Sequence, residues 1–490
     1  NFYKLKPKNL IAVTGTNGKT SVADFYYQIL NSYNIPVASV GTFGVKSKNM
    51  RIKTNLTSPD IITLHKNLEI LKKKKVDNVI IEASSHGLKQ NRLDKLNFNV
   101  GIFTNFSQDH LDYHKTMKAY LNSKLILFKK LLPKKSSIIA DGSSKEFSIL
   151  KKISKKRKLK LFDSSKEKFN TTDIPKIFSN TFQTKNLIMA TIAAKLSKLD
   201  NLKIKKIIKK IKHVEGRLEL VRTLPNNVKV YVDYAHTPEA LNEAIRSLKQ
   251  QNRNKISIVF GCGGERDFKK RPLMAKIAKS LCEKIYVTDD NPRNENPKKI
   301  RSQIIRHLKK NNYYDIGNRS KAIKEAVTKA EPNETIIVAG KGHENFQDYG
   351  HKKILISDRQ IIKKLKIKKK QLNKRISNYK FNSNILNSLL GSKKFYKING
   401  IAIDSRNVKK NNLFLAIRGK NNDGNQFIKK AIQKGASFAI TSNSKKNLNK
   451  KIIKVKNVNN FLNGFAKIKR EKSNAKILAI TGSAGKTSLK

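Results

Sequence analysis

A glycine-rich loop near the start of the chain has the residue types and spacing that bind phosphate. Residues 14–21 read Thr-Gly-Thr-Asn-Gly-Lys-Thr-Ser and follow the apolar run Leu10–Val13. Glycines let backbone N–H groups close around phosphate oxygens, the lysine supplies a cation, and Thr20 supplies a hydroxyl for Mg²⁺. The loop therefore predicts a site for ATP and Mg²⁺. Its predicted nucleotide-binding residues are Gly15, Thr16, Asn17, Gly18, Lys19, Thr20 and Ser21.

A second loop of the same kind lies close to the last residue of the sequence. Residues 481–488 read Thr-Gly-Ser-Ala-Gly-Lys-Thr-Ser and follow another apolar run, 477–480. Because the sequence stops at Lys490, we expect this loop to open a second nucleotide site that is cut short. Its candidate residues are Gly482, Gly485, Lys486 and Thr487.

Two further residues have the chemistry of metal ligands and follow expected buried strands. Glu82 comes directly after Asn78–Ile81, and His110 comes shortly after Val100–Phe103. Together with the Thr20 hydroxyl, a carboxylate and an imidazole are able to hold a divalent cation. Taken alone, Glu82 is better explained as a solvated acid at a strand end, and His110 as an ordinary loop histidine.

The strongest compositional feature is a formal net charge of +70, from 105 Lys and Arg against 35 Asp and Glu. Such a charge suits a nucleic-acid partner, since phosphate contacts are made by basic side chains. The lysines are spread along the whole chain, however, without a stripe of interleaved aromatics, and tryptophan is absent. We therefore favour general compositional drift over a basic nucleic-acid-binding protein, and expect no specific nucleic-acid partner.

Cysteine content and hydropathy bear on the compartment. The two cysteines form no CxxC motif, which favours a reducing environment. Neither a signal-peptide pattern nor a run of about 20 apolar residues is present. We expect a cytoplasmic, monomeric protein without a membrane span.

Strand-like and helix-like runs alternate along most of the chain, which predicts an α/β protein with parallel sheets covered by helices. A polar, Lys/Ser-rich stretch over 141–180 shows little pattern, so we expect a loose region there. The expected domains are 1–220 around the first phosphate loop, 221–362 as a Rossmann-like α/β domain, a Lys-rich linker over 363–377, a small α/β domain over 378–474, and the truncated opening of another domain over 475–490.

Several motifs occurring in order give the chain a resemblance to a known family. They are the first phosphate loop, Glu-Ala-Ser-Ser-His-Gly-Leu at 82–88, Thr-Asn-Phe-Ser-Gln-Asp-His-Leu-Asp-Tyr-His at 104–114, and Asp-Tyr-Ala-His-Thr-Pro at 233–238. The chain resembles the Mur ligase family, ATP-dependent amide ligases that build the peptidoglycan precursor. Residues 1–365 resemble the central and C-terminal domains of the branch that adds the third peptide residue. Folylpolyglutamate synthase, which shares the fold and the loop, is the nearest alternative.

The resemblance implies a reaction and a set of catalytic residues. Joining a carboxylate to an amine requires activation, here by transfer of the γ-phosphoryl group of ATP to give an acyl phosphate. Lys19, Glu82, His110 and Lys124 match catalytic positions, and Lys124 matches a carbamylated lysine that would join Thr20, Glu82 and His110 at the metal. Other matches on the nucleotide side are Asn186, Arg217, Asp233 and His236. Matches on the side of the UDP-MurNAc-L-Ala-D-Glu substrate are Thr57, Ser58, Ser84, Gln90 and Arg92.

Residues 289–293, Asp-Asp-Asn-Pro-Arg, resemble the form found in ligases that add meso-diaminopimelate. This amino acid ends in an extra carboxylate, which a fixed guanidinium can bind in a bidentate manner. Lysine would place an ammonium against the same guanidinium and be rejected. The implied residues for this substrate are Arg271, Asn291, Pro292, Arg293, Gly340 and Glu344.

Residues 378–490 resemble the N-terminal part of another branch, the ligases that add D-alanyl-D-alanine. Ser405 and Arg406, which follow Asp404, are candidates for uridine contacts, with a structural turn as the alternative. Residues 1–9 leave no room for a UDP-binding domain of the first ligase. We therefore expect a segment of a fused ligase pair, cut at both ends.

Overall fold

The computed structural model describes residues 5–167, 174–175, 178, 182–251, 254–308, 312–365, 383–391, 398, 400–419, 422–443 and 451–471. The chain divides into two compact units, Asn1–Lys366 and Ile367–Lys490. The second phosphate-type loop and residues 366–377 of the expected linker lie outside the described residues. Within the described ranges, no helix has the length and apolar character needed to cross a membrane.

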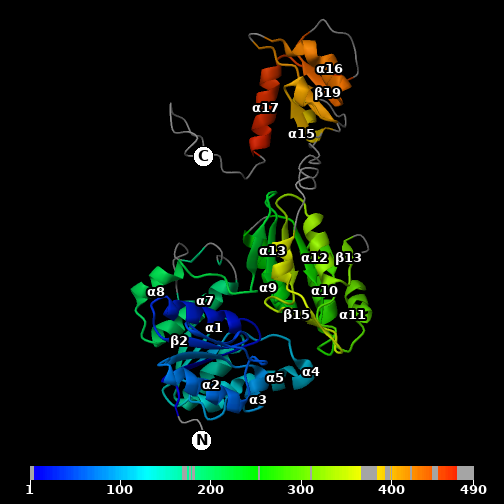
Figure 1. Ribbon diagram of the computed structural model, residues 1–490. Coiled ribbons are helices and arrows are strands. Elements are labelled where there is room, and N and C mark those ends of the chain that lie inside the picture. Colours follow the sequence, from blue (N-terminus) through cyan, green and yellow to red (C-terminus); the bar gives the residue numbers. More distant parts are fainter. Residues whose placement is uncertain are drawn as a thin grey trace. The chain divides into compact units, whose positions relative to one another are not determined.

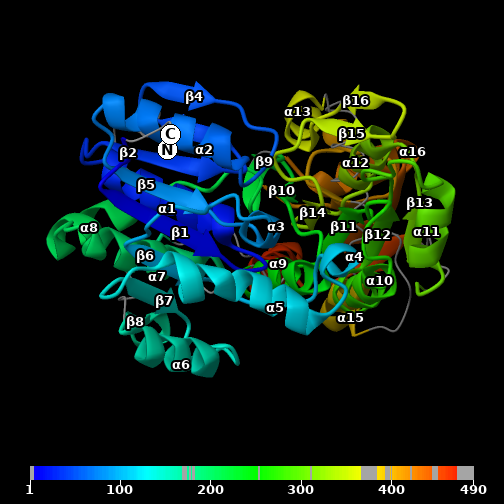
Figure 2. The ribbon, with the colours of Figure 1, turned by 90° about the horizontal axis from the view of Figure 1, so that it is seen from below.

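An eight-stranded sheet forms the first half of the first unit, in the order β4-β3-β2-β5-β1-β6-β7-β8 (Figure 2). The strands from β2 to β8 in this order run parallel, and β3 and β4 are antiparallel to their neighbours. The strands are β1 (Asn9–Thr14), β2 (Val37–Gly41), β3 (Gly44–Ser47), β4 (Met50–Ile52), β5 (Asn78–Glu82), β6 (Val100–Phe103), β7 (Ser137–Ala140) and β8 (Lys160–Asp163).

Helices cover both faces of this sheet because successive side chains of a strand point to opposite faces. In β1, Leu10 and Ala12 enter one hydrophobic core, whereas Ile11 and Val13 enter the other. In Figure 1, α1 and α7 lie on one side of β2, and α2 and α3 lie on the other. One face carries α1 (Lys19–Asn31), α7 (Phe182–Leu196) and α8 (Asn201–Ile208); the other carries α2 (Ile61–Lys73), α3 (Ser85–Lys89), α5 (Met117–Ile126) and α6 (Phe147–Arg157).

The expectation of a loose region over 141–180 is wrong for its first half. Residues 147–157 form α6 and residues 160–163 form β8, the edge strand of the sheet. Leu150 and Ile153 of α6 are buried in the core, while the lysines between and after them are exposed. The few apolar residues of this segment repeat every three to four positions, as in a helix, but the many lysines around them make that repeat hard to recognise in the sequence.

A six-stranded sheet forms the second half of the same unit, in the order β13-β12-β11-β14-β10-β9, and is parallel except for β9. The expected boundary at 220/221 falls inside β9. The strands are β9 (Glu219–Thr223), β10 (Lys229–Asp233), β11 (Ile256–Phe260), β12 (Lys284–Val287), β13 (Tyr313–Asp315) and β14 (Thr335–Ala339). The helices are α9 (Pro238–Gln251), α10 (Lys270–Leu281), α11 (Pro297–Ile305), α12 (Arg319–Thr328) and α13 (Asp358–Lys364), and a hairpin pairs β15 (Phe346–Asp348) with β16 (Lys353–Leu355).

The second unit is a small α/β domain built on a parallel four-stranded sheet. Alternation again separates two cores, since Leu413 and Leu415 enter one and Phe414 and Ala416 enter the other. Its elements are β17 (Gly400–Ala402), β18 (Asn412–Leu415), β19 (Ala436–Thr441), β20 (Ile452–Lys454), α15 (Ser383–Leu390), α16 (Ile428–Gln433) and α17 (Val458–Glu471). The predicted α/β class with parallel sheets is confirmed.

Candidate active site

A cavity of about 380 Å³ in the first unit is lined by loops from both sheets. The lining loops follow the carboxyl ends of β1, β5, β6 and β10, where ligands bind in open α/β sheets. The structure brings most of the residues predicted for catalysis, nucleotide and UDP-muramoyl peptide to this cavity. They are Thr16, Asn17, Gly18, Lys19, Thr20, Ser21, Thr57, Ser58, Glu82, Ser84, Arg92, His110, Lys124, Arg217, Asp233 and His236.

The phosphate loop is held from below by the residues that follow β6. The Thr16 N–H donates to the carbonyl oxygen of Asn105 (2.9 Å), and the Asn17 N–H donates to the Asn105 side-chain oxygen (2.9 Å). The Thr104 hydroxyl donates to the carbonyl oxygen of Asn17 (2.6 Å). Gly15 has φ +146°, and a Cβ there would lie 1.9 Å from the Thr104 hydroxyl oxygen. Only glycine therefore fits where the loop packs against Thr104 and Asn105.

Lys19 is the first residue of α1, and its side chain reaches back to the phosphate loop. Its ammonium donates to the carbonyl oxygens of Gly15 (2.9 Å) and Thr16 (2.8 Å). Burial lowers the pKa of Lys19, partly offset by the charges of Glu82 and Asp109. Gly18, with φ +87°, precedes the helix, and a Cβ on it would lie 2.5 Å from the side-chain oxygen of Asn186. Asn186 thus closes the same end of the loop without lining the cavity.

Oxygen atoms suited to Mg²⁺ cluster where β5 ends and α1 begins. The Thr20 hydroxyl donates to Glu82 Oε2 (2.8 Å), and the Thr42 hydroxyl lies 3.1 Å from the same oxygen. Among the described residues, no group of three or more His, Cys, Asp or Glu side chains could hold a metal ion. The cluster still fits Mg²⁺, which is often bound through one or two carboxylates together with substrate phosphates and water.

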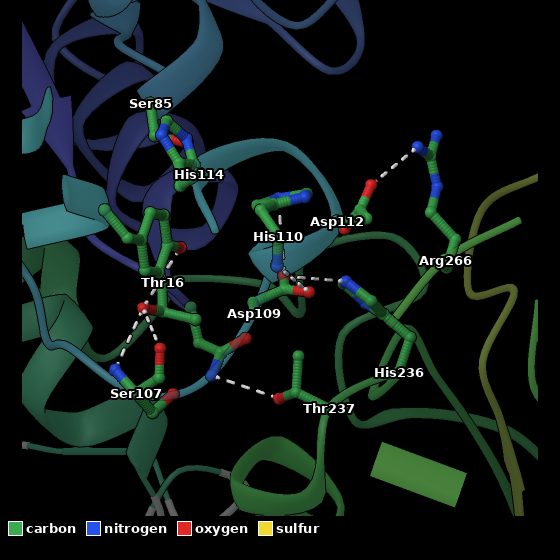
Figure 3. A network of polar contacts seen from close by, with 12 residues as sticks. Thr16, Ser85, Ser107, Asp109, His110, Asp112, His114, His236, Thr237 and Arg266 are labelled. Atoms are coloured by element: carbon green, nitrogen blue, oxygen red, sulfur yellow. Dashed lines mark hydrogen bonds and ion pairs between the residues drawn. The ribbon is translucent and has the colours of Figure 1, made fainter. Parts of the chain in front are cut away.

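A buried carboxylate, Asp109, joins the two halves of the unit (Figure 3). Its Oδ2 lies 3.4 Å from Nε2 of His110 and 3.4 Å from Nε2 of His236, which follows β10. Burial acts to raise the pKa of Asp109, but the hydrogen bond from His236 and nearby positive charge hold it well below its usual range. Burial lowers the pKa of His110 to about 3, which leaves a neutral imidazole, the form that binds metals. Asp109 therefore orients His110 and also contacts His236, which belongs to the half of the unit built on the second sheet.

Further contacts between the two halves come from the same stretch of chain. Gln108 donates to Asp267 (2.8 Å), and Arg266 forms a 3.4 Å ion pair with Asp112, as Figure 3 shows for the latter pair. The sequence-based site omitted Asp109 and Arg266. Asp109 stands inside the motif at 104–114, so its position next to His110 was an available signal, whereas nothing near Arg266 indicated a partner at Asp112.

Lys124, on α5, is 1% exposed and faces the phosphate loop. Its ammonium donates to the carbonyl oxygen of Gly15 (2.7 Å) and lies 4.3 Å from the ring centroid of Tyr120. Burial, followed by repulsion from Lys19, lowers the pKa of Lys124 well below its usual value. A lowered pKa increases the fraction of neutral amine, which is the reactive form of this side chain.

Several residues predicted for the UDP-muramoyl peptide also support one another. The Ser58 hydroxyl donates to the Glu82 carbonyl oxygen (2.8 Å), and Ser84 caps α3 by accepting from the Gly87 N–H (3.0 Å). Arg92 donates to the Ser58 carbonyl oxygen (2.9 Å) and to the Gln90 side chain. Gln90 is the one member of the predicted group that does not line the cavity. These contacts fix the rim of the cavity beside Glu82.

Arg217, just before β9, and Asp233 and Tyr234, at the end of β10, line the cavity from the side of the second sheet. Arg217 lies 3.3 Å from the Thr20 hydroxyl and 4.3 Å from the ring centroid of Tyr234. Asp233 accepts from the backbone N–H groups of Leu218 and Ala235, and burial raises its pKa. Asp233 therefore lines the cavity and also caps the turn after β10.

The residues predicted for the incoming amino acid do not line the 380 Å³ cavity, although Gly340 and Glu344 contact residues that do. Arg271, 1% exposed, forms two hydrogen bonds with Glu295 (2.6 and 2.7 Å). Arg293 donates to the Gly264 carbonyl oxygen (2.6 Å). Asn291 donates to Glu344 (3.1 Å), the Pro292 carbonyl oxygen accepts from the Glu295 N–H (3.1 Å), and the Gly340 N–H donates to the backbone carbonyl oxygen of Asp233 (3.1 Å).

In the second unit, Ser405 is buried and Arg406 is exposed. The Asp404 side chain accepts from the Arg406 N–H (2.8 Å) and pairs with its guanidinium (2.8 Å). This arrangement is the local turn that was the alternative to a uridine contact.

Comparison with family models places three matches along the chain. The Mur ligase middle domain matches residues 13–207, and the model described as Mur ligase, glutamate ligase domain matches residues 216–342. A third, described as Mur ligase family, catalytic domain, matches residues 397–470.

Individual proteins extend this similarity. A UDP-N-acetylmuramoyl-L-alanyl-D-glutamate–2,6-diaminopimelate ligase from Rickettsia bellii is 39% identical, over 74% of this chain and 81% of the relative. The Brucella melitensis protein of the same name is 38% identical, over 73% and 77%. A solved structure of such a ligase aligns with TM-score 0.50 at 29% identity, over 73% of this chain and 78% of the other. Mycobacterium tuberculosis folylpolyglutamate synthase shares the fold, with TM-score 0.55 at 15% identity over 68% and 88%. This chain belongs to the Mur ligase family.

Proposed function

We propose that residues 1–365 form an ATP-dependent ligase that joins meso-diaminopimelate to UDP-MurNAc-L-Ala-D-Glu through an acyl phosphate. The observation that carries the proposal is the convergence of Lys19, the Thr20–Glu82 pair and Arg217 on one cavity, in a chain whose relatives are named diaminopimelate ligases. Cations and a metal-binding oxygen pair around one phosphate cradle are what phosphoryl transfer to a carboxylate requires.

Each residue has a distinct task in this proposal. The backbone of the phosphate loop cradles the phosphates of ATP, and Lys19 offsets charge on the transferring group. Thr20 and Glu82, with His110 and a carbamylated Lys124, would hold Mg²⁺; when bound, the ion neutralises charge on the phosphate oxygens. The lowered pKa of Lys124 supports carbamylation, because a neutral amine is what reacts with CO₂.

Selection of the amino acid is assigned to the network around residues 291–344. The Arg293 guanidinium, anchored on Gly264 by one nitrogen, would bind the distal carboxylate of meso-diaminopimelate. Glu344 would accept the substrate ammonium. For Arg271, the ion pair with Glu295 supports a role in shaping this region rather than direct contact.

We also propose that residues 378–474 are a UDP-binding-type domain of a second ligase. The match of residues 397–470 to a Mur ligase family model supports this assignment. Titrating UDP against the whole chain, with Arg406→Ala as the variant, tests the uridine contact. An unchanged affinity for UDP in the variant would show that Arg406 serves only the local turn with Asp404 and does not contact uridine.

An ADP-release assay on the whole chain tests the main proposal. UDP-MurNAc-L-Ala-D-Glu and Mg²⁺ are supplied with either meso-diaminopimelate or L-lysine, and Lys19→Met serves as the inactive control. We expect turnover with meso-diaminopimelate only, and a loss of about a thousand-fold in the control, typical of removing a group that stabilises transition-state charge. Turnover with lysine alone, or none with either amino acid, contradicts the proposal.

A further inference from the structure

Lys341 is a fully buried lysine beside the residues assigned to the incoming amino acid, and it has no role so far. It is 0% exposed and lies in the loop directly after β14. The residues on both sides of Lys341 are glycines with positive φ, +111° at Gly340 and +52° at Gly342, a conformation that other residues rarely adopt. A Cβ on Gly342 would lie 2.7 Å from the carbonyl oxygen of Gly216. The lysine is thus held in place by close backbone packing.

The Lys341 ammonium contacts two of the proposed substrate residues. It donates to Glu344 Oε2 (2.8 Å) and to Asn291 Oδ1 (2.9 Å). A buried ammonium is costly unless it is paired and hydrogen-bonded, and Glu344 supplies the pairing charge.

These contacts also determine which way the Asn291 amide faces. Its oxygen accepts from Lys341 and from the Asp348 N–H (3.0 Å), and its nitrogen donates to Glu344 Oε2 (3.1 Å). Because an ammonium only donates, Lys341 excludes the flipped amide, which would turn two donors toward each other.

The two oxygens of Glu344 are consequently unequal. Oε2 accepts from both Lys341 and Asn291, whereas Oε1 has one long contact, 3.4 Å from the Tyr234 hydroxyl. Tyr234 in turn lines the 380 Å³ cavity and stacks against Arg217. The better-satisfied oxygen faces the lysine, and the other faces the residue that borders the cavity.

We propose that Lys341 is a positioning residue for the amino-acid subsite: it fixes the Asn291 amide and turns Glu344 so that Oε1 meets the substrate ammonium. This inference rests on the proposed function. A purely structural lysine would affect stability alone, whereas a positioning lysine affects the apparent affinity for the amino acid and leaves that for ATP unchanged.

The experiment compares Lys341→Met with Lys298→Met, an exposed lysine on α11. We expect the KM for meso-diaminopimelate to rise about ten- to a hundred-fold in Lys341→Met, the range for hydrogen bonds to charged groups. The KM for ATP should stay within about two-fold, as should both values in the control. A folded Lys341→Met chain with unchanged KM for meso-diaminopimelate, or with equal rises for both substrates, overturns the inference.

A double-mutant cycle that combines Lys341→Met with Glu344→Gln tests whether Lys341 acts on substrate binding through Glu344 or independently of it. Non-additive changes in the KM for meso-diaminopimelate support the inference, and additive changes overturn it. If Lys341→Met loses its cooperative thermal transition, Lys341→Gln, which keeps a donor without the charge, takes its place in the cycle. A wild-type chain inactive with meso-diaminopimelate overturns the proposed function and this role together, while an active one with an unaffected variant overturns only the role.

Discussion

The phosphate loop is held through its own backbone groups and leaves no room for a Cβ at Gly15, whereas around residues 291–344 charged side chains hold one another. Gly15 and Thr16 are placed by a backbone hydrogen bond and by close approach to Thr104 and Asn105. Asn291 and Glu344 are placed by the buried Lys341. The difference teaches that the first region depends on shape, so it tolerates few side chains, while the second depends on charge and orientation, so it is where selectivity can be changed.

The largest effect should come from adding one methyl group to the phosphate loop. Gly15→Ala places a Cβ 1.9 Å from the Thr104 hydroxyl oxygen at a φ that alanine rarely adopts, so we expect a loss of about 2–4 kcal/mol in the free energy of unfolding and no measurable ATP binding. Thermal unfolding and calorimetric titration with ATP measure both.

Gly419→Ala is the matched control, because its Cβ would meet only the Asn422 carbonyl oxygen, at 3.5 Å. Equal stability and ATP affinity of Gly15→Ala and the wild-type chain would show that the loop is not constrained by shape.

A smaller and more selective effect is expected on the amino-acid side. Arg293→Ala removes the guanidinium proposed for the distal carboxylate, so the KM for meso-diaminopimelate should rise about ten- to a hundred-fold with little change in ATP binding. Arg306→Ala, at an exposed position after α11, is the control. Unchanged kinetics in Arg293→Ala would reject its role, and a parallel loss of ATP affinity would remove the contrast between the regions.

The smallest effect concerns a contact between the region of residues 291–344 and the turn that follows β2. The His343 ring packs on Phe43 (centroids 5.1 Å apart) and on Tyr234 (5.4 Å), and burial lowers the pKa of His343 to about 3. The imidazole of His343 takes up a proton near pH 6.5 in the unfolded chain but only near pH 3 in the folded chain. The contribution of the neutral, buried ring to the free energy of unfolding is therefore complete above pH 6.5 and is lost as the pH falls.

Between pH 7 and pH 5, this single group should cost about 1–2 kcal/mol of unfolding free energy. Urea unfolding of the wild-type chain and of His343→Phe at both pH values measures it, and the variant should lose correspondingly less. Identical pH dependence would show that His343 takes up its proton in the folded chain as readily as in the unfolded one.

Much of the fold followed from local patterns, because apolar residues of a strand repeat with period two and those of a helix with period three to four. Asn78–Ile81 was expected as a buried strand and lies in β5, Asn78–Glu82, and the expected strand Val100–Phe103 is β6. The pattern failed at α6, where exposed lysines outnumber the few buried residues. The antiparallel pair β3 and β4 was also missed, since such short edge strands carry too few apolar residues to be recognised.

The phosphate loop, its place between a strand and a helix, and the family were all identified from the sequence, because these features depend on residues that are neighbours in the chain. The pairing of charged groups that are distant in the sequence became visible only in the folded chain. Asp109 meets His236, Arg266 meets Asp112, and Lys341 holds Asn291 across 50 positions of sequence. The physical reason is that a hydrogen bond or an ion pair acts over a few ångströms, and chain folding, not sequence spacing, sets which groups come within that distance.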